Sequence, residues 1–212
     1  MDAIEKIGFY HAFCSAVRAY KNGCIPIGCA ILDAGGKVIS QAENCQYSNL
    51  PNEIIKNHPL AHAEINAILK TSSYIHKNIA SYTLFSTLEP CPLCFGAIVM
   101  GGIKNVKFAA LDKNNEFEKL NDSLEFISKA NINIKGPFDR YQIVQIALIV
   151  RRRLEKEFDN NKEVIEIYNN YCREGVQLGY YLRNDTHFHQ LLSNKNNEKQ
   201  ILDYILSLNE NY

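Results

Sequence analysis

The sequence predicts an α/β fold in which helices cover a β-sheet, followed by a helical appendage. Segments with apolar residues at helical spacing alternate with short apolar runs of strand length, in the order helix, hairpin, helix, strand, helix, strand. Beyond residue 137 helical spacing dominates. We therefore expect a core at 1–136 and a C-terminal helical extension at 137–212 that packs on it.

The breaks between elements carry their own signals. Asn22-Gly23 provides a C-cap for the first helix, and the turn residues at 33–36 join two strands into a hairpin. Pro59 is expected to open the second helix. The core elements are expected as a helix at 2–20, strands at 27–32 and 37–42, a helix at 59–70, a strand at 82–86, a helix at 92–100 and a strand at 105–111.

The pattern weakens after Asp112, where the assignments rest on shorter runs. We expect a helix at 117–130, an edge strand at 132–134, a break at Gly136-Pro137, a helix at 141–158 and two more helices, one reaching residue 180 and one at 198–208. The tyrosines of this region are expected to pack the appendage onto the core, with a lid over a substrate as the less favoured alternative: Tyr168, Tyr171, Tyr180 and Tyr181.

The neutral charge balance bears on the class of substrate. Lys and Arg number 23, as do Asp and Glu, so the formal net charge of the 212 residues is zero. A protein dedicated to nucleic acid usually shows a basic excess, so a polynucleotide substrate is disfavoured. The strongest basic run, Arg151-Arg152-Arg153, stands beside Glu155 and is expected on the solvated face of a helix.

The chain is expected in the cytoplasm, because it shows neither a long apolar run nor a signal peptide, and no membrane partner is predicted. Thiols stay reduced in that compartment, and seven cysteines without regular spacing do not suggest disulfides. A close cysteine pair therefore indicates metal binding or redox chemistry.

Two short segments carry such chemistry: His62-Ala63-Glu64 and Pro90-Cys91-Pro92-Leu93-Cys94. Cys91 and Cys94 are three apart at a helix start, which places both sulfurs on one side and favours the thiolate form. With His62 they make three zinc ligands and leave the fourth tetrahedral position for a water molecule or hydroxide. That stoichiometry is typical of a catalytic zinc.

Glu64 indicates the reaction. His62 and Glu64 can converge only where a helix opens, because residues two apart do not share a helix face. A carboxylate beside the zinc-bound water can accept its proton and return it to a ring nitrogen and to departing ammonia. The pattern H-x-E followed by P-C-x-x-C is the signature of zinc deaminases.

Two other chemistries would use some of the same residues. A structural zinc would need a fourth protein ligand such as Cys45 or His58, and a redox role would use the Cys-x-x-Cys pair alone. Both are disfavoured because His62 and Glu64 match as well. His187 and His189 give a weaker hint of a second metal site.

Five segments, in one order over the first half of the chain, carry a resemblance to a known family: Ile25-Pro-Ile-Gly-Cys-Ala-Ile31, Glu43-Asn44, Leu60-Ala-His-Ala-Glu-Ile-Asn-Ala67, Thr87-Leu-Glu-Pro-Cys-Pro-Leu-Cys-Phe-Gly-Ala-Ile98 and Val106-Lys-Phe-Ala-Ala-Leu-Asp112. They resemble the cytidine deaminase-like superfamily, in the branch of bacterial tRNA adenosine deaminases and guanine deaminases. The resemblance implies a three-layer α/β/α fold with a five-stranded mixed sheet, one Zn²⁺ per subunit and frequently a homodimer. It also implies the substrate-binding candidates Asn44, Ala63, Pro90, Asp112 and Ile27.

The prediction is a zinc-dependent hydrolytic deaminase of a small nucleobase or nucleoside, with a purine favoured and a cytosine type still open. The first alternative is a tRNA adenosine deaminase, with the run at 151–153 as a local basic rim. The second alternative is a catalytically inactive binding module of the same fold.

Overall fold

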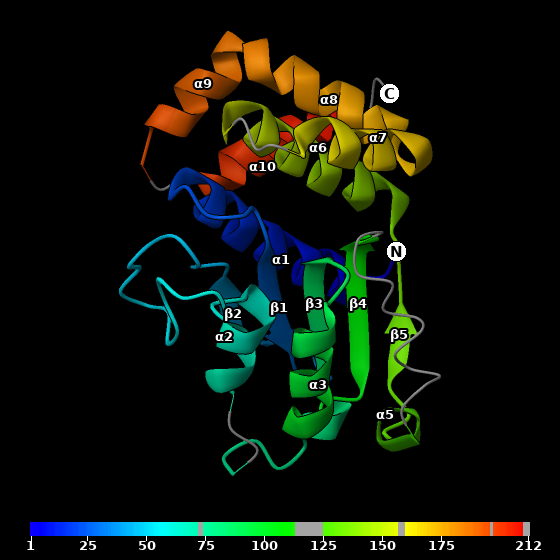
Figure 1. The fold of residues 1–212 in the computed structure, drawn as a ribbon. Coiled ribbons are helices and arrows are strands. Elements are labelled where there is room, and N and C mark those ends of the chain that lie inside the picture. The colour runs from blue at the N-terminus through cyan, green and yellow to red at the C-terminus, as the bar shows by residue number, and fades with distance from the viewer. Residues whose placement is uncertain (72–73, 113–124, 157–159, 196, 210–212) are drawn as a thin grey trace.

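The structure of the protein is a computed structural model that describes residues 1–71, 74–112, 125–156, 160–195 and 197–209 (Figure 1). Its centre is a five-stranded sheet in the order β2-β1-β3-β4-β5. β1 pairs antiparallel with both β2 and β3, whereas β3, β4 and β5 run parallel. The expected mixed sheet is confirmed. Its strands are β1 (Gly28–Leu32), β2 (Val38–Glu43), β3 (Thr83–Leu88), β4 (Asn105–Ala110) and β5 (Asn133–Lys135).

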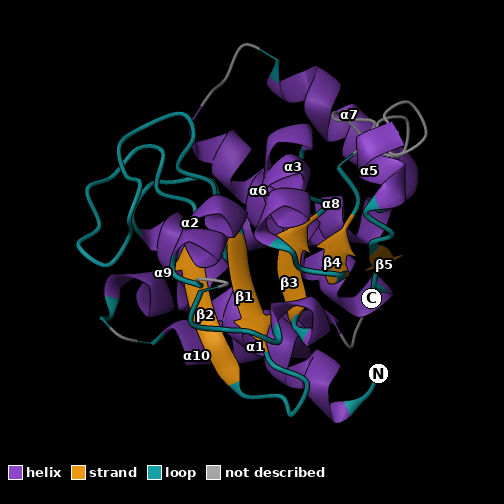
Figure 2. Cartoon of the chain, turned by 90° about the horizontal axis from the view of Figure 1, so that it is seen from below, coloured by secondary structure: helices purple, strands orange, loops and turns teal. Residues whose placement is uncertain are grey.

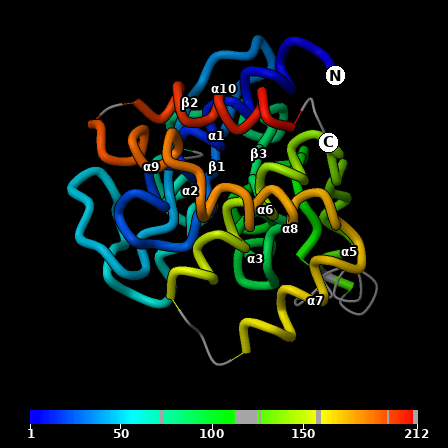
Figure 3. The backbone as a smooth tube through the Cα atoms, turned by 90° about the horizontal axis from the view of Figure 1, so that it is seen from above, coloured from blue at the N-terminus to red at the C-terminus, as the bar shows by residue number. Residues whose placement is uncertain are grey.

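Helices cover both faces of this sheet (Figures 1 and 2). α2 and α3 lie on one face, α1 lies on the other, and α6 lies across the ends of β3 and β4 that are uppermost in Figure 1. α8, α9 and α10 form a further group outside α1 and α6 (Figure 3). The helices are α1 (Ala3–Lys21), α2 (Ala63–Leu69), α3 (Pro92–Gly101), α5 (Glu125–Lys129), α6 (Asp139–Lys156), α7 (Asn161–Tyr171), α8 (Arg173–Asn184), α9 (Thr186–Ser193) and α10 (Glu198–Leu208), with a 3-10 turn at Ile79–Ser81.

Two apolar cores lie on the two sides of the sheet, and a third, which includes Leu88, Ala110 and Tyr168, joins the strand ends to α6 and α7. Ile31 and Leu84 face Phe95 of α3 on one side, whereas Phe85 packs with Phe9 on the other, where α6 and the C-terminal helices join the same cluster. The alternation of Leu84 and Phe85 between the two cores follows from the two-residue period of a strand. α6 contacts β3 and β4 directly, so the region after residue 137 begins with a helix that packs against these strands. Among the described helices, none is long and apolar enough to cross a membrane.

The second helix begins later than expected, at Ala63 instead of Pro59. The carbonyl of Ala61 accepts the backbone N–H of Cys45 at 2.9 Å, and the carbonyl of Pro59 accepts Nε2 of Gln46 at 2.6 Å. These bonds join the turn before His62, in which the Ala61 N–H donates to the His58 carbonyl at 2.9 Å, to the loop that follows β2, and His62 is the extended N-cap of α2. Part of the helix expected at 117–130 lies outside the described residues, and α5 occupies the described part.

The expectation of a solvated basic run at 151–153 is wrong for its first two residues. Arg151 is 1% exposed, where its Nε donates to the carbonyl of Leu182 and its Nη1 pairs with Glu155 at 2.6 Å. Arg152 is 7% exposed, and its Nε donates to the carbonyl of Cys24 at 2.8 Å. Carbonyls and a carboxylate thus replace water around these guanidinium groups, which a helical charge pattern does not reveal.

Glu5 connects the start of α1 to β4 and to the edge strand β5. Its side chain is 2% exposed and pairs with Lys107 of β4 at 3.0 Å and with Lys135 of β5 at 2.7 Å. It also accepts the backbone N–H of Asp2 in a capping box. Burial would raise the pKa of Glu5, but the hydrogen bonds from Lys135, Lys107 and Asp2 outweigh burial and lower the pKa to about 2.

This lowered pKa predicts a pH-dependent stability. Because Glu5 binds its proton less readily when folded, its contribution is complete above the unfolded pKa near 4.5 and is lost as the pH falls towards 2. We expect Glu5→Gln to lower the free energy of unfolding at pH 7 and to converge with the parent chain at low pH. Urea denaturation between pH 2 and pH 7 measures this, and Glu125→Gln, an exposed pair with Lys129, is the control with little expected effect. A Glu5→Gln deficit that stays constant over this pH range would contradict the account.

Candidate functional site

The candidate site lies where α2 and α3 begin side by side. His62 is the N-cap of α2 and Cys91 is the N-cap of α3, which continues with Pro92 at its first position. Neither side chain makes a capping hydrogen bond, so the imidazole and the thiol are both turned to other partners. Cys94 follows in the first turn of α3, three residues after Cys91, and its side chain is buried. The two helix starts therefore deliver three metal-ligating groups to one place.

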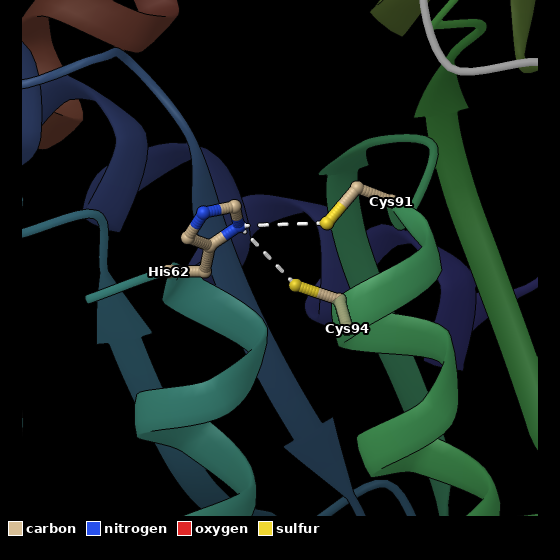
Figure 4. A group of neighbouring side chains, drawn as sticks. All are labelled: His62, Cys91 and Cys94. Atoms are coloured by element: carbon tan, nitrogen blue, oxygen red, sulfur yellow. Dashed lines mark hydrogen bonds between the residues drawn. The ribbon is translucent and has the colours of Figure 1, made fainter. Parts of the chain in front are cut away.

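The three groups have the spacing of a metal site (Figure 4). Nδ1 of His62 lies 3.7 Å from Sγ of Cys91 and 3.4 Å from Sγ of Cys94, and the three ligand atoms lie within 4.8 Å of one another. Zn–S bonds of about 2.3 Å and Zn–N bonds of about 2.0 Å in a tetrahedron place neighbouring sulfur and nitrogen ligands about 3.6 Å apart. The donor set fits zinc, and these residues could hold the ion.

The fourth protein ligand of a structural zinc is not found at the expected candidates. Within the described part of the chain, His62, Cys91 and Cys94 form the only such cluster of three. The Cys45 thiol donates to the Ser48 carbonyl at 3.0 Å, and Nδ1 of the exposed His58 accepts the Leu60 N–H. The arrangement therefore favours a site with an open position over a closed structural site.

The surroundings of the three side chains favour a thiolate at one of the two cysteines, Cys91. A hydrogen bond from Cys94, helped by His62, lowers the pKa of Cys91 to about 4. The same hydrogen bond to Cys91, together with burial, raises the pKa of Cys94. The hydrogen bond to Cys91 raises the pKa of His62, although burial opposes it. Thiols bind a metal ion as thiolates and imidazole binds it in the neutral form. A divalent cation would therefore take the place of the thiol and imidazole protons and compensate the charge of the two thiolates.

Glu64 lies beside the cluster as the second residue of α2. Its side chain is 3% exposed, its Oε1 accepts the hydroxyl of Ser86 at 3.0 Å, and its Oε2 accepts the thiol of Cys94 at 3.5 Å. Burial raises the pKa of Glu64 above its usual value. A buried carboxyl with a raised pKa is suited to accepting and returning a proton near neutral pH. His62 stands just outside the helix and Glu64 just inside it, so the two side chains converge as the sequence required.

A cavity of about 370 Å³ opens onto Glu64, His62 and Cys91. Its volume falls near the low end of the range of about 300–1,000 Å³ for small-molecule sites. The wall combines loop residues, strand ends and the C-terminal helices. The other lining residues are Ile25, Pro26, Ile27, Asn44, Gln46, Tyr47, Leu88, Glu89, Asp112, Ile149, Arg152, Arg153, Asn160 and Tyr168.

Three of the five substrate-binding candidates line this cavity: Ile27, Asn44 and Asp112. Asn44 is 1% exposed, and its Oδ1 accepts the backbone N–H of Gln46 at 3.2 Å, so it closes a turn as well as facing the cavity. The other two, Ala63 and Pro90, are buried and do not belong to the lining set. The substrate-binding roles of all five stay predictions.

Sequence patterns missed several residues of the site. Ser86, the partner of Glu64, stands in β3 with no signal beyond its place in a strand. Gln46 follows Asn44 by two residues, a spacing typical of a turn, but its contact with Pro59 depends on the tertiary fold. Tyr168 is 3% exposed and lines the cavity from α7. Tyr171 contacts Tyr168 within α7, and its hydroxyl donates to the Leu111 carbonyl at 2.7 Å, which joins the appendage to the core. Tyr180 and Tyr181 are 46% and 44% exposed, so the expectation that they pack the appendage onto the core is wrong for these two.

Comparisons with known proteins agree with this site. The family model for the cytidine and deoxycytidylate deaminase zinc-binding region matches residues 6–110. A tRNA-specific adenosine deaminase from Buchnera aphidicola subsp. Schizaphis graminum is 35% identical over 136 residues, which cover 62% of this chain and 83% of that protein. A cytosine deaminase from Candida albicans is 31% identical over 102 residues, or 48% of this chain and 63% of that protein. The chain belongs to the cytidine and deoxycytidylate deaminase family.

The fold agrees as well. The structure of a guanine deaminase from Nitrosomonas europaea superposes with a TM-score of 0.52 at 18% identity, covering 72% of this chain and 85% of that one. This likeness confirms the cytidine deaminase-like fold. The chain spans only 62–63% of the length of several of the curated relatives that it matches in sequence.

The cluster geometry predicts the effect of removing one ligand. We expect the parent chain to bind one zinc ion and Cys94→Ser to lose most of it and to melt at a lower temperature, because metal binding and folding are coupled. Cys14→Ser, at a half-buried thiol outside the cluster, is the matched control and should keep the ion. Zinc per chain by elemental analysis, with melting curves, measures both effects. Full zinc content in Cys94→Ser would show that the ion binds elsewhere.

Proposed function

We propose that the chain is a zinc-dependent hydrolytic deaminase of a small nucleobase or nucleoside. The observation that carries the proposal is the buried carboxyl of Glu64, which contacts the zinc-ligand candidate Cys94 and lines the cavity beside His62 and Cys91. A metal site alone would suit several chemistries, but a carboxyl with a raised pKa beside it supplies the proton transfers of deamination. The names of its relatives, which include adenosine, cytosine and guanine deaminases, support the same reaction class.

In this proposal the chain's own residues move protons and orient the substrate. Bound zinc would lower the pKa of a water molecule to about 7. Glu64 accepts one proton from the attacking water and passes it to a ring nitrogen of the base. It then accepts the remaining proton of the added hydroxyl group and passes it to the departing amine. The C–N bond breaks, a carbonyl replaces it and ammonia leaves. Ser86 positions Glu64 through its hydrogen bond, and Asn44 orients the base.

A purine substrate is favoured, because the adenosine and guanine deaminases among the relatives act on purines by name. The cytosine deaminase keeps a pyrimidine open. A tRNA substrate is the second candidate, since several relatives bear the name tRNA-specific adenosine deaminase. The zero net charge favours a small molecule over tRNA. An inactive binding module is the third candidate. The hydrogen bond from Ser86 to Glu64 does not support it, because a module without catalysis has no need of a positioned carboxyl group.

Glu64 gives the direct test of the reaction. We expect Glu64→Gln to keep its zinc and to lower kcat for ammonia release by at least about 100-fold, because the amide cannot transfer the proton. An ammonia-release screen over free bases, nucleosides, nucleotides and tRNA provides the substrate, and Glu163→Gln, on the exposed side of α7, is the control. Substantial turnover by Glu64→Gln would overturn the role of this residue.

The same screen separates the candidate functions. Turnover of tRNA with salt-sensitive binding, and no release from free nucleosides, would favour the editing enzyme. Absence of ammonia from the whole panel, with zinc bound, would favour the inactive module.

We also propose that the chain forms a homodimer through the outer face of α2 and α3. These two helices lie side by side on one face of the sheet (Figure 1). Large apolar side chains are exposed on both: Leu69 is 49% exposed, Leu93 43% and Met100 76%. Exposed apolar side chains on two neighbouring helices support an interface between two copies of the chain at this place.

We expect sedimentation velocity to report a dimer for the parent chain and a shift towards monomer for Met100→Asp, since a charge in an apolar interface is costly to bury. Tyr180→Asp, at an exposed aromatic residue on α8, should leave the dimer intact. A monomeric parent chain at micromolar concentration would contradict the proposal.

A further inference from the structure

The cavity has a wall that the family match does not cover. The matched region ends at residue 110, whereas Arg152, Arg153 and Tyr168 line the cavity from α6 and α7. This wall is specific to the chain's own C-terminal helices. Its chemistry therefore has to be deduced from the residues that form it.

Charges on the cavity wall are divided between two groups of elements. Glu64 stands on α2, while Glu89 and Asp112 follow β3 and β4, with Oε2 of Glu89 accepting the Asp112 N–H at 3.0 Å. Among the described lining residues, the only Lys or Arg side chains are Arg152 and Arg153 of α6. A ligand that fills the cavity thus meets the Glu64 carboxyl, which contacts the zinc-ligand candidate Cys94, and the two guanidinium groups of α6.

Arg152 is held firmly at this wall. Its Nε donates to the Cys24 carbonyl at 2.8 Å and its Nη2 to the Gly23 carbonyl at 3.2 Å, while its guanidinium lies 5.6 Å from the centre of the Tyr47 ring. Burial lowers the pKa of this guanidinium, so its placement costs free energy that an apolar side chain would avoid. A fixed, nearly buried cation on a cavity wall is suited to recognition of an anion.

Arg153 is held beside it by the start of α7. Its Nη1 donates to Oδ1 of Asn160 at 3.2 Å and of Asn161 at 3.4 Å, and Nδ2 of Asn161 donates back to the Arg153 carbonyl at 2.8 Å. Neighbouring residues on a helix point in different directions. Both guanidinium groups still line one cavity, since Arg152 extends to the loop after α1 and Arg153 extends to the start of α7. The planar fork of arginine matches the oxygens of a phosphate group.

We propose that the substrate carries a phosphate group, bound by Arg152 and Arg153, and that it is a nucleoside monophosphate whose base lies against Glu64. This inference rests on the proposed deaminase function and narrows its substrate class. The cavity of about 370 Å³ has the size of a small-molecule site, and the zero net charge favours a mononucleotide over a nucleic acid. Tyr47 and Tyr168 are the aromatic side chains of the same wall.

Binding to the zinc-loaded Glu64→Gln chain tests the proposal without turnover. Calorimetry compares guanosine, adenosine and cytidine with their 5′-monophosphates. For at least one pair we expect the monophosphate to bind at least about tenfold more tightly, as charge-assisted hydrogen bonds to a phosphate predict. Adding Arg153→Gln should remove this preference, whereas Arg183→Gln, an exposed arginine on α8, should retain it. Arg153 is only half-buried, so its replacement should leave the fold intact.

Equal affinities within all three pairs would overturn the proposal, as would a phosphate preference that survives Arg153→Gln. Binding of tRNA that mononucleotides do not compete with would also overturn it. Ammonia release by the parent chain separates the two claims. Release from nucleosides without any phosphate preference would leave the deaminase and remove only this inference. Phosphate-dependent binding without release from any compound would leave a phosphate site at the two arginines but contradict the deaminase, and with it the claim that the bound monophosphate is a substrate.

Discussion

Nδ1 of His62 and the sulfurs of Cys91 and Cys94 can meet only because α2 and α3 begin side by side at one edge of the sheet. The apolar core on that face fixes the two helices against β1 and β3. Each helix start then contributes a residue that is still extended, the N-cap, and unpaired N–H groups that favour a thiolate. The position of the helices on the sheet thus determines the ligand geometry, the acidity of Cys91 and the placement of Glu64.

The rest of the cavity is organised around the same edge. The loop after β2 is joined to the connection before His62 by the Cys45–Ala61 and Gln46–Pro59 bonds, so Asn44 and the metal ligands form one unit. α6 contacts β3 and β4 and packs with α1, and its Gln145 donates to the Pro26 carbonyl at 2.8 Å. The C-terminal helices therefore serve two purposes: they complete the apolar core, and they close the cavity with polar and aromatic groups.

Local sequence patterns predicted what local physics determines. The five strands, the hairpin turn at 33–36 and the convergence of His62, Glu64, Cys91 and Cys94 follow from short spacings and turn residues. The sequence predicts the start of α2 at Pro59, because proline is favourable at a helix opening. The helix begins later, since the Ala61 carbonyl accepts the backbone N–H of Cys45, a long-range bond that the local sequence does not show. The buried state of Arg151 and Arg152 depends on carbonyls at Leu182 and Cys24, residues distant in sequence. The places of Ser86 and Tyr168 in the site likewise depend on contacts between residues that are distant in the sequence.

The central claim is a zinc site that has three protein ligands and one open position, with Glu64 beside it. X-ray absorption at the zinc edge of the purified protein tests it most directly, because the ligand types and their number appear in one spectrum. The account predicts two sulfur ligands, one imidazole nitrogen and one further light atom that an added anion or substrate analogue displaces. Four protein ligands with no exchangeable position would contradict the account, because they would define a structural zinc.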